Sequence, residues 1–242
     1  MLRSLRLAAL LGSLLMAVAA SARDIDAASY GYPLTNPFEA TIATTPPDQR
    51  PTLPSDDEIS QSDYSLNLRP EREFTLPDNF WAVKKLKYRL ARQDHEAPLI
   101  FIIAGTGAPY SSSINEYLKK LFYQGGFHVV QLSSPTSYDF MSAASRFATP
   151  GVSQEDAEDM YRVMQAVRAQ HPRLPVSEFY LTGYSLGALD AAFVSHLDET
   201  RRSFNFKRVL LLNPPVNLYT SINNLDKLVQ TQVKGIDRST TF

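Results

Sequence analysis

A Gly-Tyr-Ser-Leu-Gly pentapeptide centred on Ser185 constrains the fold of this chain more than any other feature. It lies between a short apolar run, residues 178–182, and a helix-like segment, residues 186–198. A G-x-S-x-G pattern between a strand and a helix is the sequence form of a nucleophile elbow, a strained turn that raises a serine hydroxyl above a sheet. Gly183 and Gly187 would let that strand and helix approach closely. We therefore expect Ser185 at the tip of a tight strand-to-helix turn.

Apolar runs alternate with helix-like segments before and after the pentapeptide. The expected strands are residues 81–90, 98–103, 127–132, 178–182 and 207–212, and the expected helices are 113–123, 153–171 and 186–198. The pattern Ser-Ile-Asn-Glu at residues 113–116 predicts a capping box at the first helix. Strands that are apolar throughout favour a mostly parallel sheet with helices on both faces, an α/β fold. We expect the first two strands, joined by a short turn, to be the antiparallel exception.

Over residues 80–216 the chain resembles an α/β-hydrolase, since strand, helix and strand precede the pentapeptide in the order of that family. The resemblance implies a serine hydrolase in which the Ser185 hydroxyl attacks an acyl carbonyl, most simply that of a carboxylic ester. It implies an oxyanion hole made by the backbone amides of Leu186 and Thr106, with Gly107 beside them. The His-Gly of the family is Ala-Gly at residues 104–105, which keeps the backbone donor.

The general base that such a serine needs is hard to find in this sequence. The order in the family is serine, acid, histidine, and only His196 follows Ser185. On the same helix it would lie about 16 Å from the turn by helical rise, so we expect a surface or packing role. The other histidines belong to the amino-terminal edge of the parallel sheet, away from the ligand-binding edge, and are His95, His128 and His171.

No carboxylate stands at an evident acid position either. Asn213 follows the strand where some family members carry the acid, and an amide cannot stabilise an imidazolium as a carboxylate does. Asp139 is expected to line or cap its loop, and Asp190 to cap its helix or to face solvent. Asp226 and Asp237 fall in the tail, where a cap would begin.

Three hypotheses fit these gaps. The sequence is the amino-terminal portion of a longer exported bacterial serine hydrolase, whose acid and histidine follow Phe242. Alternatively, it is a complete non-catalytic binding or scaffold protein with a relict elbow. A third possibility is an acyltransferase or depolymerase that acts on envelope polymers.

The amino terminus has the pattern of a Sec-type signal peptide, residues 1–22, with Arg3 and Arg6 before an apolar run and a small-residue cleavage site. Eight of the 16 prolines fall in residues 23–78, which predicts an extended arm with at most edge strands. Residues 79–216 would form the hydrolase core, and residues 217–242 the start of a cap or a carboxy-terminal helix. Without cysteine, an exported fold must be stabilised by its core rather than by disulfides.

Composition limits the partners of the chain. A net charge of −1 and a pI near 6.4 give no sign of a nucleic-acid surface. No metal-ligand set or cofactor fingerprint is present, so we expect no cofactor. The expected setting is the periplasm or the exterior of a bacterium, with no stable membrane span after signal cleavage. The expected partner is a small-molecule, lipid or polymer acyl substrate.

Overall fold

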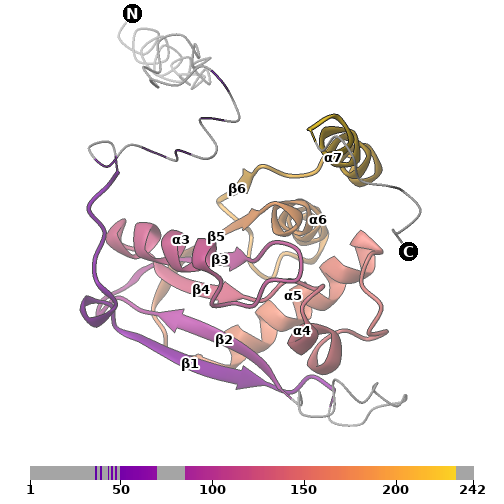
Figure 1. Cartoon of the computed structure of the whole chain (residues 1–242). Coiled ribbons are helices and arrows are strands. Elements are labelled where there is room, and N and C mark those ends of the chain that lie inside the picture. The colour runs from indigo at the N-terminus through magenta and orange to yellow at the C-terminus, as the bar shows by residue number, and fades with distance from the viewer. Residues whose placement is uncertain are drawn as a thin grey trace, which may run out of the picture. The chain divides into compact units, whose positions relative to one another are not determined.

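The computed structural model describes residues 50–69 and 85–232, together with residues 36, 39, 43, 45 and 47. The expected signal peptide lies outside these residues. Residues 53–242 form one compact unit, whose described part contains a six-stranded sheet in the order β1-β2-β4-β3-β5-β6 (Figure 1). The strands are β1 (Gln61–Leu66), β2 (Leu86–Ala91), β3 (Ala97–Ile103), β4 (His128–Leu132), β5 (Val176–Tyr184) and β6 (Arg208–Leu212). The last four run parallel to one another, so the predicted fold class is confirmed.

The expected pairing of the first two core strands is wrong. β2 is antiparallel, but its neighbours are β1 and β4, because β4 lies between β2 and β3. Strand burial explains this order. β3 is buried along almost its whole length, as suits the middle of a sheet covered on both faces, whereas Lys87 in β2 is exposed. The short turn between β2 and β3 therefore does not close a hairpin.

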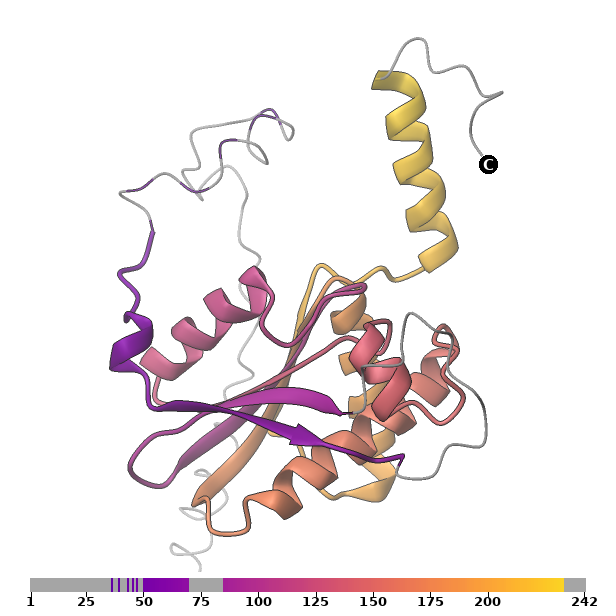
Figure 2. The ribbon, with the colours of Figure 1, turned by 60° about the horizontal axis from the view of Figure 1, so that its bottom comes forward.

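Helices cover both faces of the sheet (Figure 2). On one face, Leu118 of α3 (Ser113–Gln124) packs with Ile100 and Ile102 of β3. On the other face, the cluster around Phe101 and Ile103 includes residues of α4 (Tyr138–Ala143), α5 (Ser153–Gln170) and α6 (Leu186–Arg201). Successive β3 side chains thus enter opposite layers of the core.

Two helix starts differ from the sequence predictions. The amino-terminal cap of α3 is Ser112 rather than Ser113, and its side chain makes no capping bond. Glu116, the expected partner in the capping box, instead forms ion pairs with Arg89 and Lys119. Helix α4 was not expected, because six residues are too few to show a helical period.

The proline-rich stretch contributes to the folded core. A short 3-10 helix, Asp56–Glu58, precedes β1, which forms the edge of the sheet next to β2. The ammonium group of Lys119 is fully buried and lies 3.2 Å from Asp56 Oδ1, 2.7 Å from Gln61 Oε1 and 2.6 Å from Glu116 Oε2. This cluster joins the 3-10 helix and β1 to α3, so the core begins upstream of residue 79.

Helix α7 (Leu218–Gln232) follows β6 and includes much of the segment expected to begin a cap or a carboxy-terminal helix. Its large apolar side chains are exposed, with Tyr219 at 78% and Leu225 at 62%. None of the helices in the described part of the chain has the length and apolarity needed to cross a membrane.

Candidate active site

Ser185 alone separates β5 from α6, and it forms the strained turn that the pentapeptide predicts. Ser185 has φ 55° and ψ −123°, a backbone conformation that non-glycine residues rarely adopt. Its N–H donates to Leu212 O of the neighbouring strand at 2.9 Å, which fixes the turn against β6. The side chain of Ser185 is half-buried. A backbone outlier of this kind costs of order 1–3 kcal/mol and persists only where its surroundings hold it.

The two glycines of the turn are required by close backbone contacts. A Cβ atom on Gly183 would lie 2.0 Å from Gly187 O, and one on Gly187 would lie 2.3 Å from Ile103 O. Both distances are far below any real carbon–oxygen contact, and the atoms met are backbone. Any side chain at either position would therefore push α6 away from β5 and β3.

The loop after β3 lies directly against this turn. A Cβ atom on Gly105 would be 3.5 Å from Ser185 Cβ and 3.2 Å from Tyr184 O. Within the described residues, the amides of Gly105, Thr106 and Leu186 donate to no group. Leu186 is the first residue of α6, where amide donors have no partner inside the helix. Unpaired amides thus come from both sides of Ser185, as an oxyanion hole requires.

The amide of Gly107 differs from these, because it already donates to Thr136 Oγ1 at 2.7 Å. Gly107 has φ 66°, so the chain turns sharply there. Of the two amides expected from this loop, only that of Thr106 is available. The assignment of Thr106 and Leu186 as oxyanion donors remains a prediction.

Each histidine has a partner away from Ser185. His128 is buried, where its Nδ1 accepts the Gln93 N–H at 3.0 Å and its Nε2 contacts Pro175 O at 2.9 Å. His171, at the end of α5, bonds the Tyr88 hydroxyl through Nε2 at 2.7 Å. Burial lowers the pKa of both imidazoles. The remaining two pair with neighbouring carboxylates, His95 with Asp94 and His196 with Glu199.

No described side chain hydrogen bonds to the Ser185 hydroxyl. The expectation that none of the four histidines serves as its base agrees with these positions.

Asp139 has the expected role of lining its loop, since it accepts hydrogen bonds from Ser133 at 3.0 Å and from Ser137 at 2.6 Å.

The expectation that Asp190 caps its helix or faces solvent is wrong. Asp190 is only 2% exposed rather than facing solvent, and its Oδ2 has no hydrogen-bond partner among the described residues. Burial, and then the nearby Asp156 carboxyl of α5, raise its pKa to about 8. The helical period could have shown this, because Asp190 lies three residues after Gly187 and four before Val194, both buried.

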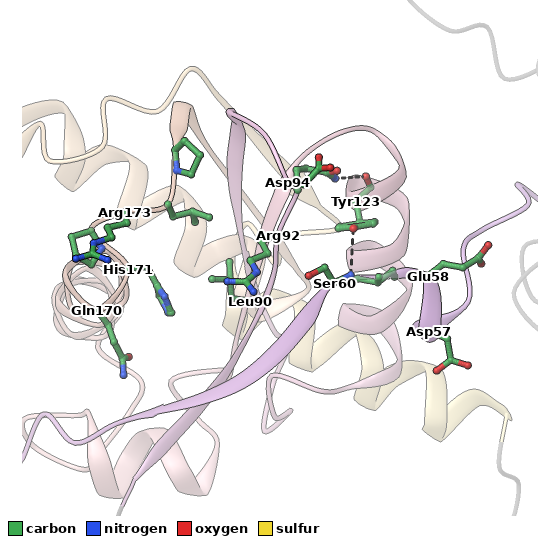
Figure 3. Close-up of a pocket in the computed structure, with 15 residues that line it drawn as sticks. Asp57, Glu58, Ser60, Leu90, Arg92, Asp94, Tyr123, Gln170, His171 and Arg173 are labelled. Carbon is green, nitrogen blue, oxygen red and sulfur yellow. Dashed lines mark hydrogen bonds between the residues drawn. The ribbon is translucent and has the colours of Figure 1, made fainter.

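An open pocket of about 1150 Å³ lies near the amino-terminal end of β5, at the opposite end of that strand from Ser185. Figure 3 shows its lining residues. They come from the end of β2, the segment before β1, the end of α3 and the loop between α5 and β5, and include Arg92, His171 and Arg173 (Figure 3). Ser185 is not among them. Ligands of open parallel sheets bind at the carboxyl edge, where the turn lies, so we assign the candidate chemistry to the turn.

The described residues contain no group of three or more histidine, cysteine or acidic side chains placed to hold a metal ion.

No family model matches this chain, and no curated protein sequence is similar to it. Solved structures do resemble it. Brefeldin A esterase, a bacterial homologue of human hormone sensitive lipase, is 15% identical with a TM-score of 0.47, over 79% of this chain and 51% of that one. Est1E from Butyrivibrio proteoclasticus is 16% identical with a TM-score of 0.40, over 54% and 47%. A thermostable esterase from Pseudomonas putida is 15% identical with a TM-score of 0.44, over 67% and 46%.

The chain spans about half the length of these structures. Its own geometry carries the assignment of the fold. Ser185 occupies a strained turn between β5 and α6, at the carboxyl edge of a mostly parallel sheet that is covered by helices on both faces. This arrangement is the expected α/β fold, of the α/β-hydrolase type, with Ser185 in an elbow-shaped turn.

Proposed function

We propose that this chain carries the nucleophile and the oxyanion hole of a serine hydrolase that acts on acyl substrates, carboxylic esters in particular. The backbone of Ser185 is the single observation that supports this most strongly. Other residues also have a positive φ, such as Arg202 at the end of α6, but Arg202 is in the ordinary left-handed helical region, whereas Ser185 combines φ 55° with ψ −123°. The strain is useful where a hydroxyl must project between unpaired amides.

In the proposed reaction, Ser185 Oγ forms a bond to the acyl carbonyl carbon while its proton passes to a general base. The carbonyl π electrons move to oxygen, and the amides of Leu186 and Thr106 stabilise the resulting anion. Collapse of this tetrahedral species breaks the bond to the alcohol, which leaves with the proton of the base. Water then attacks the acyl-enzyme in the same way, which releases the carboxylic acid and restores Ser185.

The base and its acid belong, in this proposal, to a segment that follows Phe242. The histidines of this chain support the idea, since all four have partners remote from the elbow. We further propose export to the periplasm or beyond and an acyl substrate that is a small molecule, a lipid or an envelope polymer. Transfer of the acyl group to an alcohol would differ only in the second nucleophile.

The alternative function is that of an exported binding or scaffold protein with a relict elbow. The specific observation in its favour is that the Ser185 hydroxyl has no hydrogen-bonding base among the described side chains. A relict elbow would keep its backbone shape but would not react.

A fluorophosphonate probe separates the two functions. The longest natural product of the reading frame and the present chain would both be treated, alongside the Ser185→Ala variant. Ser195→Ala is the matched control, because Ser195 lies on the same helix, farther from the elbow. Labelling of the longest product that is lost in Ser185→Ala and kept in Ser195→Ala supports the hydrolase. A folded longest product that does not react supports the binding protein.

A further inference from the structure

We propose that Thr136, in the loop between β4 and α4, is a positioning residue that holds the oxyanion loop in its working shape. The inference rests on the proposed function, and it concerns a residue that the G-x-S-x-G pattern does not reveal. Its hydroxyl oxygen accepts the Gly107 N–H at 2.7 Å, across 29 positions of sequence. The contact satisfies the amide directly after Thr106, the expected oxyanion donor.

Thr136 is itself fixed by its own loop. Its Oγ1 lies 2.8 Å from Ser134 Oγ, and its N–H donates to the same Ser134 oxygen at 3.2 Å. The Ser134 N–H donates to Ala108 O at 3.0 Å, and Ser134 is fully buried. The two loops are therefore joined by bonds at Gly107 and at Ala108, through neighbouring residues of one short polar network.

The bonds on both sides of Thr106 decide which amides remain available. On the amino-terminal side, the Ala104 N–H donates to Leu132 O of β4 at 3.1 Å. On the carboxy-terminal side, Gly107 and Ala108 are held by Thr136 and Ser134. Among the described residues, only the amides of Gly105 and Thr106 donate to no group between these anchors, and Gly105 lies against Ser185. Because the Gly107 N–H donates to Thr136, it is not available to an oxyanion.

The side-chain type fits this role. Gly107 is exposed and has φ 66°, in a turn that the Ala108 N–H closes by donating to Gly105 O at 3.0 Å. The peptide between Thr106 and Gly107 lies at the tip of this turn, and Thr136 supplies the acceptor that fixes its orientation. A β-branched side chain has few χ1 rotamers, so the threonine hydroxyl is presented with little freedom. Valine has the same shape without the acceptor, and serine keeps the acceptor without the branch.

The test compares Thr136→Val, Thr136→Ser and wild type in the longest natural product of the reading frame. Thr200→Val is the matched control, at the far end of α6. Steady-state hydrolysis of p-nitrophenyl acetate and the rate of fluorophosphonate labelling report the reaction. Amide hydrogen exchange at Gly107, followed by nuclear magnetic resonance, reports the loop itself.

We expect Thr136→Val to lower kcat and the labelling rate about tenfold with KM unchanged, because an oxyanion donor acts mainly in the transition state. Gly107 should lose its protection from exchange in this variant. Thr136→Ser should stay within about twofold of wild type, as should Thr200→Val.

The outcomes distinguish the two proposals. If Thr136→Val reacts as fast as wild type, the positioning role is refuted, and the proposed hydrolase function is unaffected. An equal fall in Thr136→Val and Thr136→Ser also overturns it, because the shared hydroxyl would then not be the cause. A folded wild type that neither reacts nor hydrolyses the ester refutes the proposed function, and with it the catalytic meaning of the Thr136 contact.

Discussion

Replacing Asp190 with asparagine should make the protein increasingly stable relative to wild type as the pH rises from 4 to 8. Burial disfavours the charged form of Asp190 and raises its pKa from an ordinary value of 3.8 to about 8 in the folded chain. Below pH 3.8 the folded and unfolded states both carry the proton. Between the two pKa values only the unfolded state has released it, so the unfolded state gains free energy relative to the folded one.

The magnitude follows from the two pKa values. Each pH unit between them removes about 1.4 kcal/mol from the free energy of unfolding of wild type. From pH 4 to pH 7 the loss is about 4 kcal/mol, and it levels off above the folded pKa of about 8. Asparagine has almost the same shape and does not ionise, so the variant lacks this loss. Any cost of burying its amide is the same at every pH.

Urea unfolding followed by circular dichroism, at each pH from 4 to 8, would measure the effect as the difference between variant and wild type. That difference cancels the titration of other groups, including the neighbouring Asp156, to the extent that they are unchanged. Asp226→Asn, at an exposed position of α7, controls for the loss of one carboxyl group. A difference between Asp190→Asn and wild type that stays constant from pH 4 to pH 8 would refute the reasoning.

Three further substitutions test the elbow and the two buried polar clusters, each by equilibrium unfolding. Ser185→Gly should be about 1 kcal/mol more stable than Ser185→Ala, because glycine adopts the positive φ without strain, and a less stable glycine variant would argue against strain. Lys119→Met should lower the free energy of unfolding by about 2 kcal/mol, since it removes the buried cation that pairs with Asp56 and Glu116. An unchanged stability at both low and high salt would contradict this. Tyr161→Phe removes a 2.5 Å hydrogen bond to the buried Asp198 carboxylate and should lower the free energy of unfolding by about 2 kcal/mol. Tyr219→Phe, at an exposed position, should change it little. Equal effects of the two substitutions would contradict the importance of the Tyr161 contact.

The elbow could be predicted from sequence because five consecutive residues mark it. Five residues specify the turn, and Gly183 and Gly187 occur where the backbones of β5, α6 and β3 come too close for any side chain. The alternation of apolar runs and helical periods likewise predicted every strand from β2 to β6. The predicted capping box does not form, because α3 begins one residue earlier with Ser112 as its cap, and Glu116 pairs with Arg89 of β2 and Lys119 of the same helix.

Strand order could not be predicted in the same way. The turn between β2 and β3 is compatible with a hairpin, and only the burial of β3 on both faces moves it to the middle of the sheet. The contact between Gly107 and Thr136 joins loops far apart in sequence, and neither loop carries a pattern that predicts the other. Such contacts depend on which strands become neighbours, which the local pattern does not determine.

The elbow and the start of α6 combine two features that reduce stability within six residues. Ser185 has a strained backbone, and Asp190 buries a carboxyl without a hydrogen-bond partner for its Oδ2 among the described residues. Neither feature is needed to connect β5 to α6, which a relaxed turn and an apolar helix face would do at lower free energy. Local instability of this kind is typical of functional sites, where geometry for a reaction outweighs the optimum for folding. Both features lie at the start of α6, where the Leu186 amide donates to no described group, and this concentration supports the proposal that Ser185 is a nucleophile.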